Sequence, residues 1–205
     1  MKKLRNIEIT ANDLIKFSLT IVFLPCILVG CANAQKVNLS TDQAVIEQLG
    51  KLKNKEFSKD KVCIERLKES ANVIVVGFFA YDRGCRFDGA FVNSVYFEED
   101  NADLSKNALN ALGWKKANQK EREKLAMIWI EKGLLAFSTV LYAKDEKFSG
   151  SEFQPPQVVS NANGEIVITL WTSVMKRKKE YHNLEFKFTK DGNMSDGKTL
   201  DEIMP

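Results

Sequence analysis

Apolar residues recur at two different spacings along this chain. In some segments they occupy every second position or run continuously, which predicts strands, and in others they recur every three or four positions, which predicts helices. The most apolar block, NVIVVGFFAY at residues 72–81, is rich in β-branched residues and predicts a buried strand. The segments EIVITLWT at 165–172 and YHNLEFKFT at 181–189 also predict strands, since their apolar residues alternate or run continuously. A further strand is expected near GAFVNSVYFE at 89–98.

Four other segments have apolar residues at the spacing of a helix. Ser40 with Gln43 and Asn118 with Glu121 have the pattern of a capping box at a helix start. The second of the four helices would place Cys63 on the same face as Leu67. The helices are expected within residues 40–53, 58–70, 104–114 and 119–137.

Turn residues separate these elements and complete the prediction of the fold. Asp82-Arg83-Gly84 and Asn163-Gly164 predict turns between strands, and Pro155-Pro156 interrupts the chain before the C-terminal strands. No repeat or linker divides residues 40–190. We therefore expect one α+β domain over 40–190, with helices packed against one mainly antiparallel sheet, and a turn and loose tail at 191–205.

The N-terminus has the three parts of a secretory signal. A basic region reaches Lys16, an apolar run covers residues 17–29, and small residues follow from Gly30. A transmembrane helix is the competing interpretation, but Pro25 interrupts a run that is shorter than the about 20 apolar residues needed. Residues 1–30 are therefore interpreted as a signal peptide.

Leu28-Val29-Gly30-Cys31 at the end of the apolar run resembles the lipobox of bacterial lipoproteins. The resemblance implies that Cys31 receives a diacylglyceryl group on sulfur, that cleavage occurs just before it, and that the new amine is acylated, for example with palmitate. Residues 31–39 would then be a lipid-anchored tether. Ala32 after the cysteine implies the outer membrane, with the protein facing the periplasm. The alternative is that Ala32-Asn33-Ala34 is cut by an ordinary signal peptidase, which releases a soluble periplasmic protein at Gln35.

The remaining two cysteines, Cys63 and Cys85, have no C-x-x-C spacing. In an oxidising periplasm such a pair favours a structural disulfide, and two buried free thiols are the alternative. The formal charge of the whole chain is +3, but residues 1–31 hold four basic and two acidic residues. The rest of the chain is therefore nearly neutral, and we expect no nucleic-acid partner.

The sequence contains no nucleophile-elbow, zincin, P-loop or dinucleotide motif, so we expect no cofactor, no metal and no catalytic residue. Its single histidine, His182, shares strand parity with Leu184, Phe186 and Phe188. We interpret it as a structural histidine on the apolar face, with a general base as the alternative. Asp82 and Asp88 are interpreted as turn residues in preference to an acid/base pair.

Two charged segments have competing interpretations. DGNMSDGKTLDE at 191–202 partly resembles an EF-hand loop, but Asp196 stands where that loop requires glycine, so we expect a hairpin turn. The dense basic run between two predicted strands is either a solvated turn or a contact with an anionic surface such as lipid head groups. The run consists of Lys176, Arg177, Lys178 and Lys179.

These patterns lead to two hypotheses of function. The first is a noncatalytic envelope lipoprotein that binds another protein, as an accessory or toxin-neutralising factor. The second is a lipid-anchored or soluble periplasmic hydrolase with an unrecognised carboxylate site. The lone histidine favours the first hypothesis.

Overall fold

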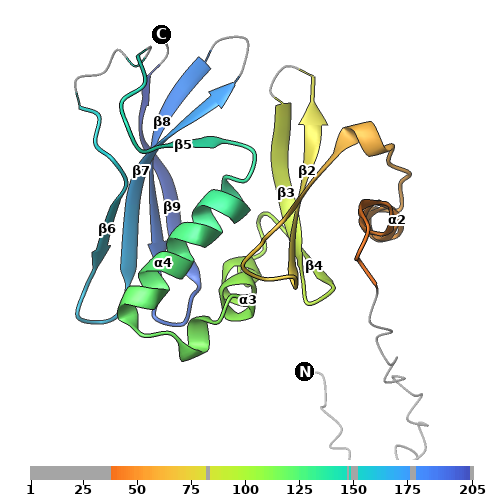
Figure 1. Cartoon of the computed structure of the whole chain (residues 1–205), viewed down its shortest axis with the longest axis horizontal. Helices are drawn as coiled ribbons and strands as arrows, with labels where there is room; N and C mark the ends of the chain where they lie inside the picture. The colour runs from red at the N-terminus through yellow and green to blue at the C-terminus, as the bar shows by residue number, and fades with distance from the viewer. Residues whose placement is uncertain (1–37, 82–83, 147, 149–151, 176–178, 204–205) are drawn as a thin grey trace, which may run out of the picture. The chain divides into compact units, whose positions relative to one another are not determined.

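The structure is a computed structural model that describes residues 38–203, apart from 82–83, 147, 149–151 and 176–178 (Figure 1). The predicted signal peptide, the lipobox with Cys31 and most of the predicted tether lie outside the described residues, as does most of the predicted turn at Asp82-Arg83. None of the helices in the described part combines the length and the apolar character that crossing a bilayer requires.

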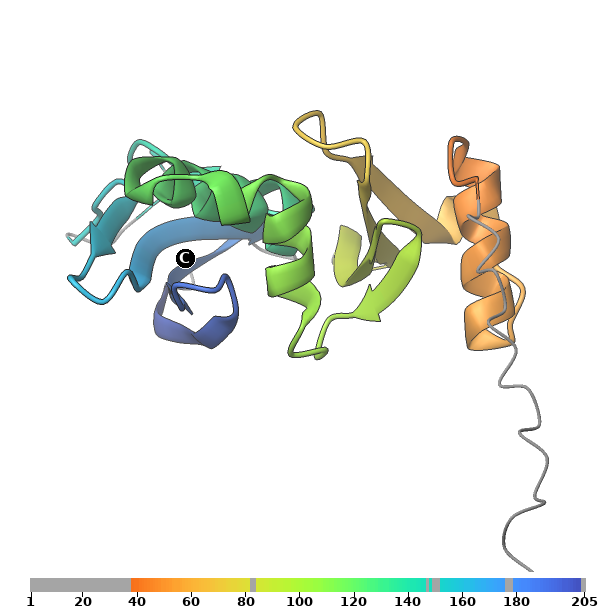
Figure 2. The same cartoon turned by 90° about the horizontal axis from the view of Figure 1, so that it is seen from below.

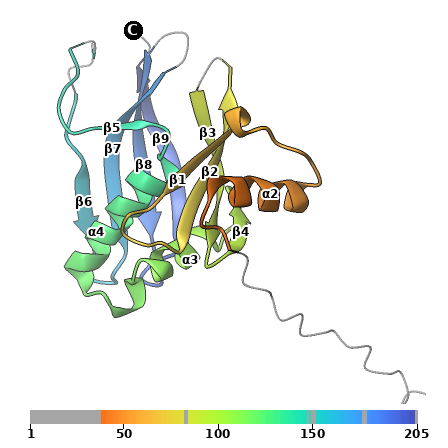
Figure 3. The ribbon, with the colours of Figure 1, turned by 45° about the vertical axis from the view of Figure 1, so that its right-hand side comes forward.

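The described strands form two antiparallel sheets, so the α+β class is confirmed but the single expected sheet is not. The first sheet has the order β1-β2-β3-β4. It consists of β1 (Val62–Arg66), β2 (Val73–Ala80), β3 (Gly84–Val92) and β4 (Val95–Glu98). The second has the order β5-β7-β8-β9, and β6 also pairs with β7 (Figure 3). It consists of β5 (Thr139–Leu141), β6 (Gln157–Ser160), β7 (Ile166–Met175), β8 (Lys179–Phe188) and β9 (Met194–Ile203).

Three α-helices accompany these sheets in the described part: α2 (Asp42–Lys53), α3 (Leu104–Ala111) and α4 (Gln119–Trp129). The capping box of Asn118 and Glu121 at the start of α4 is confirmed. The predicted cap at Ser40 is wrong by one residue, because the extended Thr41 accepts the hydrogen bond from the Ala44 amide. A π-helical turn (Ile130–Leu134) continues α4, and short 3₁₀ turns η1 (Lys59–Lys61) and η2 (Trp114–Lys116) complete the helical segments.

Two predicted elements are replaced by strands. Residues 58–70 form η1 and β1 in place of a helix, because β1 pairs antiparallel with β2 from Val62–Phe78 to Arg66–Ile74. Pairing with a buried strand outweighs a helical spacing that is only local. The predicted loose tail after residue 191 contains β9, which pairs with β8 along its length.

Two predicted turns are located by the structure. Residues 161–165 join β6 to β7, and Gly164 has the positive φ of 79° expected of a hairpin turn. The strand predicted at 89–98 divides at Asn93 and Ser94, whose φ values of 51° and 69° are those of a tight two-residue hairpin turn.

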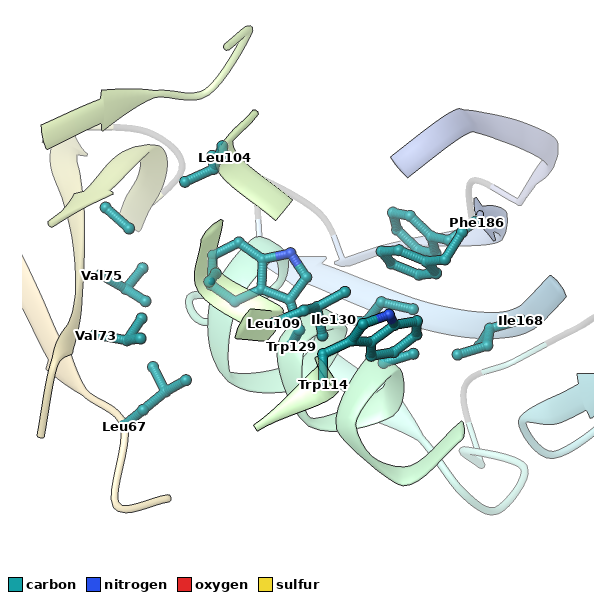
Figure 4. Close-up of a cluster of buried hydrophobic side chains, with 14 of the residues drawn as sticks. Leu67, Val73, Val75, Leu104, Leu109, Trp114, Trp129, Ile130, Ile168 and Phe186 are labelled. Atoms are coloured by element: carbon teal, nitrogen blue, oxygen red, sulfur yellow. The ribbon is translucent and has the colours of Figure 1, made fainter. Parts of the chain in front are cut away.

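The main hydrophobic core fills the space between the two sheets. Figure 4 shows side chains of the first sheet and of the second sheet converging on Trp114 and Trp129. Trp129 lies fully buried and donates a hydrogen bond from Nε1 to Ser105 Oγ at 3.0 Å. Residues of both sheets, of α3 and of α4 belong to this one core.

Further apolar groups cover the outer faces of the sheets. In Figure 2, α2 lies beyond the first sheet, on the side away from α3. Its Val45, Ile46 and Leu49 are buried. On the outer face of the second sheet, Phe148 packs edge-on against Trp171 and Tyr181 at ring distances of 4.8 and 5.2 Å.

Candidate functional site

A pocket of about 520 Å³ lies where the end of α2 meets strand β2. Helix α2 ends at Lys53, because Asn54 adopts a left-handed conformation with φ 48° and donates its amide hydrogen to the Gly50 carbonyl. The chain then turns back and leads into η1. We call this hollow the Phe57 pocket. It is lined by Lys53, Lys55, Glu56, Phe57, Ser58, Lys61, Phe78 and Phe79.

Aromatic rings form the apolar part of the Phe57 pocket. The Phe57 and Phe78 rings are stacked, with centroids 4.9 Å apart and planes 25° from parallel. Phe79 is 44% exposed, and Tyr81, just after the same strand, is 95% exposed. Aromatic residues are enriched in protein interfaces relative to the rest of the surface.

Lysines border these rings. The Lys55 Nζ lies 5.5 Å from the centroid of Phe57, which is a cation–π distance. Lys61 has a side chain that is 53% exposed, and its Nζ lies 3.9 Å from Asp60. With Lys53, three cations therefore line the pocket against one acid, Glu56.

Lys53 differs from the other two lysines because it belongs to a polar network behind the pocket. Its Nζ lies 2.9 Å from Asp88 Oδ2 and 3.2 Å from Glu98 Oε1. Burial alone would lower the pKa of Lys53, but hydrogen bonds to both carboxylates outweigh burial and raise the pKa. Tyr96 donates a hydrogen bond to Asp88, and burial together with that bond raises the pKa of Tyr96. The network ties the end of α2 to β3 and β4.

A disulfide crosses the strand that contributes Phe78 to the pocket. Cys63 of β1 is bonded to Cys85 of β3, with their Cα atoms 6.1 Å apart, so the predicted pairing is confirmed. The bridge joins the two strands that flank β2, and Cys85 pairs with the exposed Phe79. Gly77, opposite Cys63, has no space for a side chain, since a Cβ would lie 2.4 Å from both the Arg86 carbonyl and the Phe137 ring.

The predicted basic run is only partly described. Lys176, Arg177 and Lys178 lie outside the described residues. Lys179 begins β8 and forms an ion pair with Asp145, which raises the pKa of Lys179. The Lys179 side chain therefore contacts the protein's own surface.

His182 lies on the predicted face of β8, but two carboxylates flank its ring. The His182 Nε2 lies 3.5 Å from Glu180 Oε2, and Nδ1 lies 4.0 Å from Glu202 Oε1. We call Glu180, His182 and Glu202 the His182 cluster. Of the other acids considered, Asp88 lies in β3 and not in a turn, Asp82 is outside the described residues, and Asp191 lies at a turn that leads to β9.

Sequence reasoning missed both groups of residues for identifiable reasons. The Phe57 pocket was missed because residues 58–70 were predicted to form a helix. In a helix, Lys61 is not expected to lie beside β2. The available signal was Phe78, a large aromatic residue near the end of the predicted strand and on the face opposite the core residues Val73 and Val75. Glu202 was missed because β9 was not predicted.

Comparisons with known proteins do not extend this description. No family model matches the chain, and neither a curated protein nor a solved structure matches it. The chemistry of the described residues is therefore the basis for a function.

Proposed function

We propose that this protein is a lipid-anchored bacterial envelope protein that faces the periplasm and binds a partner protein without catalysis. The Phe57 pocket is the observation that carries the binding role. Lipid attachment at Cys31 and location at the outer membrane are supported by the lipobox resemblance.

The composition of the Phe57 pocket indicates the chemistry of the partner. The stacked rings of Phe57 and Phe78 offer an apolar surface for an aromatic or aliphatic side chain. Lys55 and Lys61 extend beside them, so acidic residues of a partner would meet opposite charge. We propose that the occupant is an acidic segment of an envelope protein with at least one large apolar residue.

The surroundings of the pocket favour binding because they hold it in one shape before a partner arrives. The Cys63–Cys85 disulfide restrains β1 and β3, and Lys53 links the end of α2 to Asp88. A surface that is already ordered loses less conformational entropy on association, which increases affinity.

Selection from a random peptide library tests this proposal. The full chain in detergent is the bait, and we expect the selected peptides to be rich in Asp and Glu around an aromatic or aliphatic residue. Phe57→Ala should weaken binding of a selected peptide at least about tenfold, as expected when an aromatic ring that lines the binding pocket is removed.

Charge reversal supplies the matched control. The double variant Lys55→Glu and Lys61→Glu should abolish binding of selected peptides, whereas Lys120→Glu with Lys124→Glu on the exposed side of α4 should leave it unchanged. Peptides without acidic enrichment, or peptides that bind the Lys55/Lys61 variant as tightly as the parent, would overturn the proposal. Binding of anionic vesicles through the pocket in place of peptides would also overturn it.

A further inference from the structure

The His182 cluster is assembled by the pairing of the last two strands. β8 and β9 run antiparallel, and His182 pairs directly with Glu202. Glu180 lies two residues before His182 on the same strand, so its side chain points to the same face of the sheet. Residues 22 positions apart in the chain are therefore brought to one place by backbone pairing.

Two carboxylate oxygens approach the His182 ring, one beside each ring nitrogen. The 3.5 Å from His182 Nε2 to Glu180 Oε2 and the 4.0 Å from Nδ1 to Glu202 Oε1 both exceed the usual hydrogen-bond range. Two ligand atoms of a tetrahedral Zn²⁺ lie about 3.3–3.6 Å apart, so Glu180 Oε2 is already placed to share an ion with Nε2. The Glu202 side chain has to rotate toward the same nitrogen to join them. Each of the three residues offers one ligand atom, and these atoms all lie within 4.8 Å of one another.

Burial and charge add a second argument. The side chains of Glu180 and His182 are only 14% and 17% exposed, and that of Glu202 is 41% exposed. Two carboxylates carry a formal charge of −2 beside one imidazole. On β7 the residues paired with His182 and Glu180 are Thr172 and Val174, which carry no charge. A divalent cation at this place would be attracted by both carboxylates.

We propose that Glu180, His182 and Glu202 bind a divalent transition-metal ion, with Zn²⁺ as the best fit. Imidazole nitrogen and carboxylate oxygen are both ordinary zinc ligands, and three protein ligands leave one tetrahedral position for water or another group. Only one ring nitrogen binds the ion. The other can donate its hydrogen to a carboxylate and so fix the orientation of the ring.

The competing interpretation is that the two carboxylates bracket a protonated imidazole. A proton and a metal ion cannot occupy the same ring nitrogen, so the two interpretations differ in a measurement that adds metal at constant pH. This inference does not depend on the Phe57 pocket, which lies on the first sheet.

The single histidine of the chain makes the test direct. The full chain is prepared in detergent without a polyhistidine tag and with ¹⁵N-labelled histidine, so the imidazole signals in the NMR spectrum belong to His182. We expect Zn²⁺ at constant neutral pH to shift these signals with a saturable dependence on concentration, and calorimetry to give one site per chain.

Variants locate the site. Glu180→Gln and Glu202→Gln should each weaken Zn²⁺ binding at least about tenfold, and His182→Gln should abolish it in calorimetry. Glu185→Gln is the matched control, since this carboxylate lies on the same strand and is paired with Lys187 and Lys198 at 3.3 and 3.1 Å. Glu202 lies at the sheet edge and is exposed, so its variant keeps the test valid if the buried variants do not fold.

Imidazole signals that respond to acid but not to Zn²⁺ would overturn the proposal in favour of the protonated ring. Zn²⁺ binding that survives both Glu180→Gln and Glu202→Gln would place the metal elsewhere and would overturn it as well.

Discussion

Some side chains of this fold have polar groups that are buried in partly apolar surroundings. Glu131 is an example outside the candidate sites. It lies in the π-helical turn after α4, and its Oε1 is buried with no hydrogen-bond partner among the described residues. Burial raises the pKa of Glu131 above its usual range, and the nearby Lys132 offsets this only in part. The ionised carboxylate is therefore less stable in the folded protein than in the unfolded chain.

This arrangement predicts a pH-dependent effect of Glu131→Gln. A raised pKa in the folded state means that the protonated acid contributes stability at low pH, and that this contribution is lost as pH rises through the folded pKa. We expect the Gln variant to have a higher melting temperature than the parent at pH 7. The difference should disappear below about pH 4, where Glu is also neutral in the unfolded chain.

Thermal unfolding followed by circular dichroism at both pH values measures the effect. Glu99→Gln at an exposed position serves as the control and should change the melting temperature little at either pH. A Glu131 variant that is less stable than the parent at neutral pH would contradict the prediction, because it would mean that the charged form has a stabilising partner.

At the scale of elements, local signals predicted the fold where they agreed with tertiary pairing. β2 is a continuous run of apolar residues rich in β-branched side chains, and α4 begins with a capping box. Both elements were therefore predictable from residues that are close together in the sequence. β1 was not, because the spacing of Cys63 and Leu67 is that of a helix face and only the pairing with β2 makes this segment a strand. β9 was not, because most of its side chains are exposed and its apolar pattern is weak. β9 is held in the sheet by backbone hydrogen bonds to β8, and the periodicity of side chains along a sequence carries no information about such bonds.

The same distinction explains the candidate sites. The Cys63–Cys85 pair was predictable by counting cysteines, which needs no geometry. The His182 cluster depends on the register between β8 and β9, and the Phe57 pocket depends on a chain reversal at Asn54. Neither can be obtained from spacing along the chain.

The disulfide gives a prediction at this scale. Replacing Cys63 and Cys85 with Ala opens a loop whose ends are 22 residues apart, and this should lower the free energy of unfolding by on the order of 3 kcal/mol. Hydrogen exchange should also accelerate at the end of β2, near Phe79, because the bridge no longer restrains the flanking strands.

Urea denaturation of the parent and the variant, with and without reductant, measures the loss. Reductant should lower the stability of the parent to that of the double variant and leave the variant unchanged. Equal stability of all four samples would mean that the bridge contributes nothing to folding. Labelling of both cysteines in the unreduced parent after unfolding would show that the bond is absent in the cell.

At the scale of the whole molecule, the proposed lipid anchor determines which partners the domain can meet. Each buried methylene contributes about 0.8 kcal/mol to membrane binding, so two or three acyl chains hold a protein firmly. The predicted tether of residues 31–39 is nine residues long and can extend at most about 30 Å. The Phe57 pocket would therefore bind acidic segments that lie close to the membrane surface, and partners elsewhere in the periplasm would be out of its reach.

Substitution of Cys31 tests the anchor directly. Cys31→Ser removes the sulfur that would carry the diacylglyceryl group. Labelled palmitate should therefore no longer be incorporated, and the amount of mature protein in the membrane fraction should fall. Cys26→Ser, five residues earlier in the predicted signal, is a matched control that should keep both the label and the membrane location. Metabolic labelling and membrane fractionation measure the two outcomes, and mass spectrometry of the parent identifies its first residue. An acylated Cys31 is expected there. A parent protein that begins at unmodified Gln35 would show that the Ala32-Asn33-Ala34 site is used and that the domain is free to diffuse.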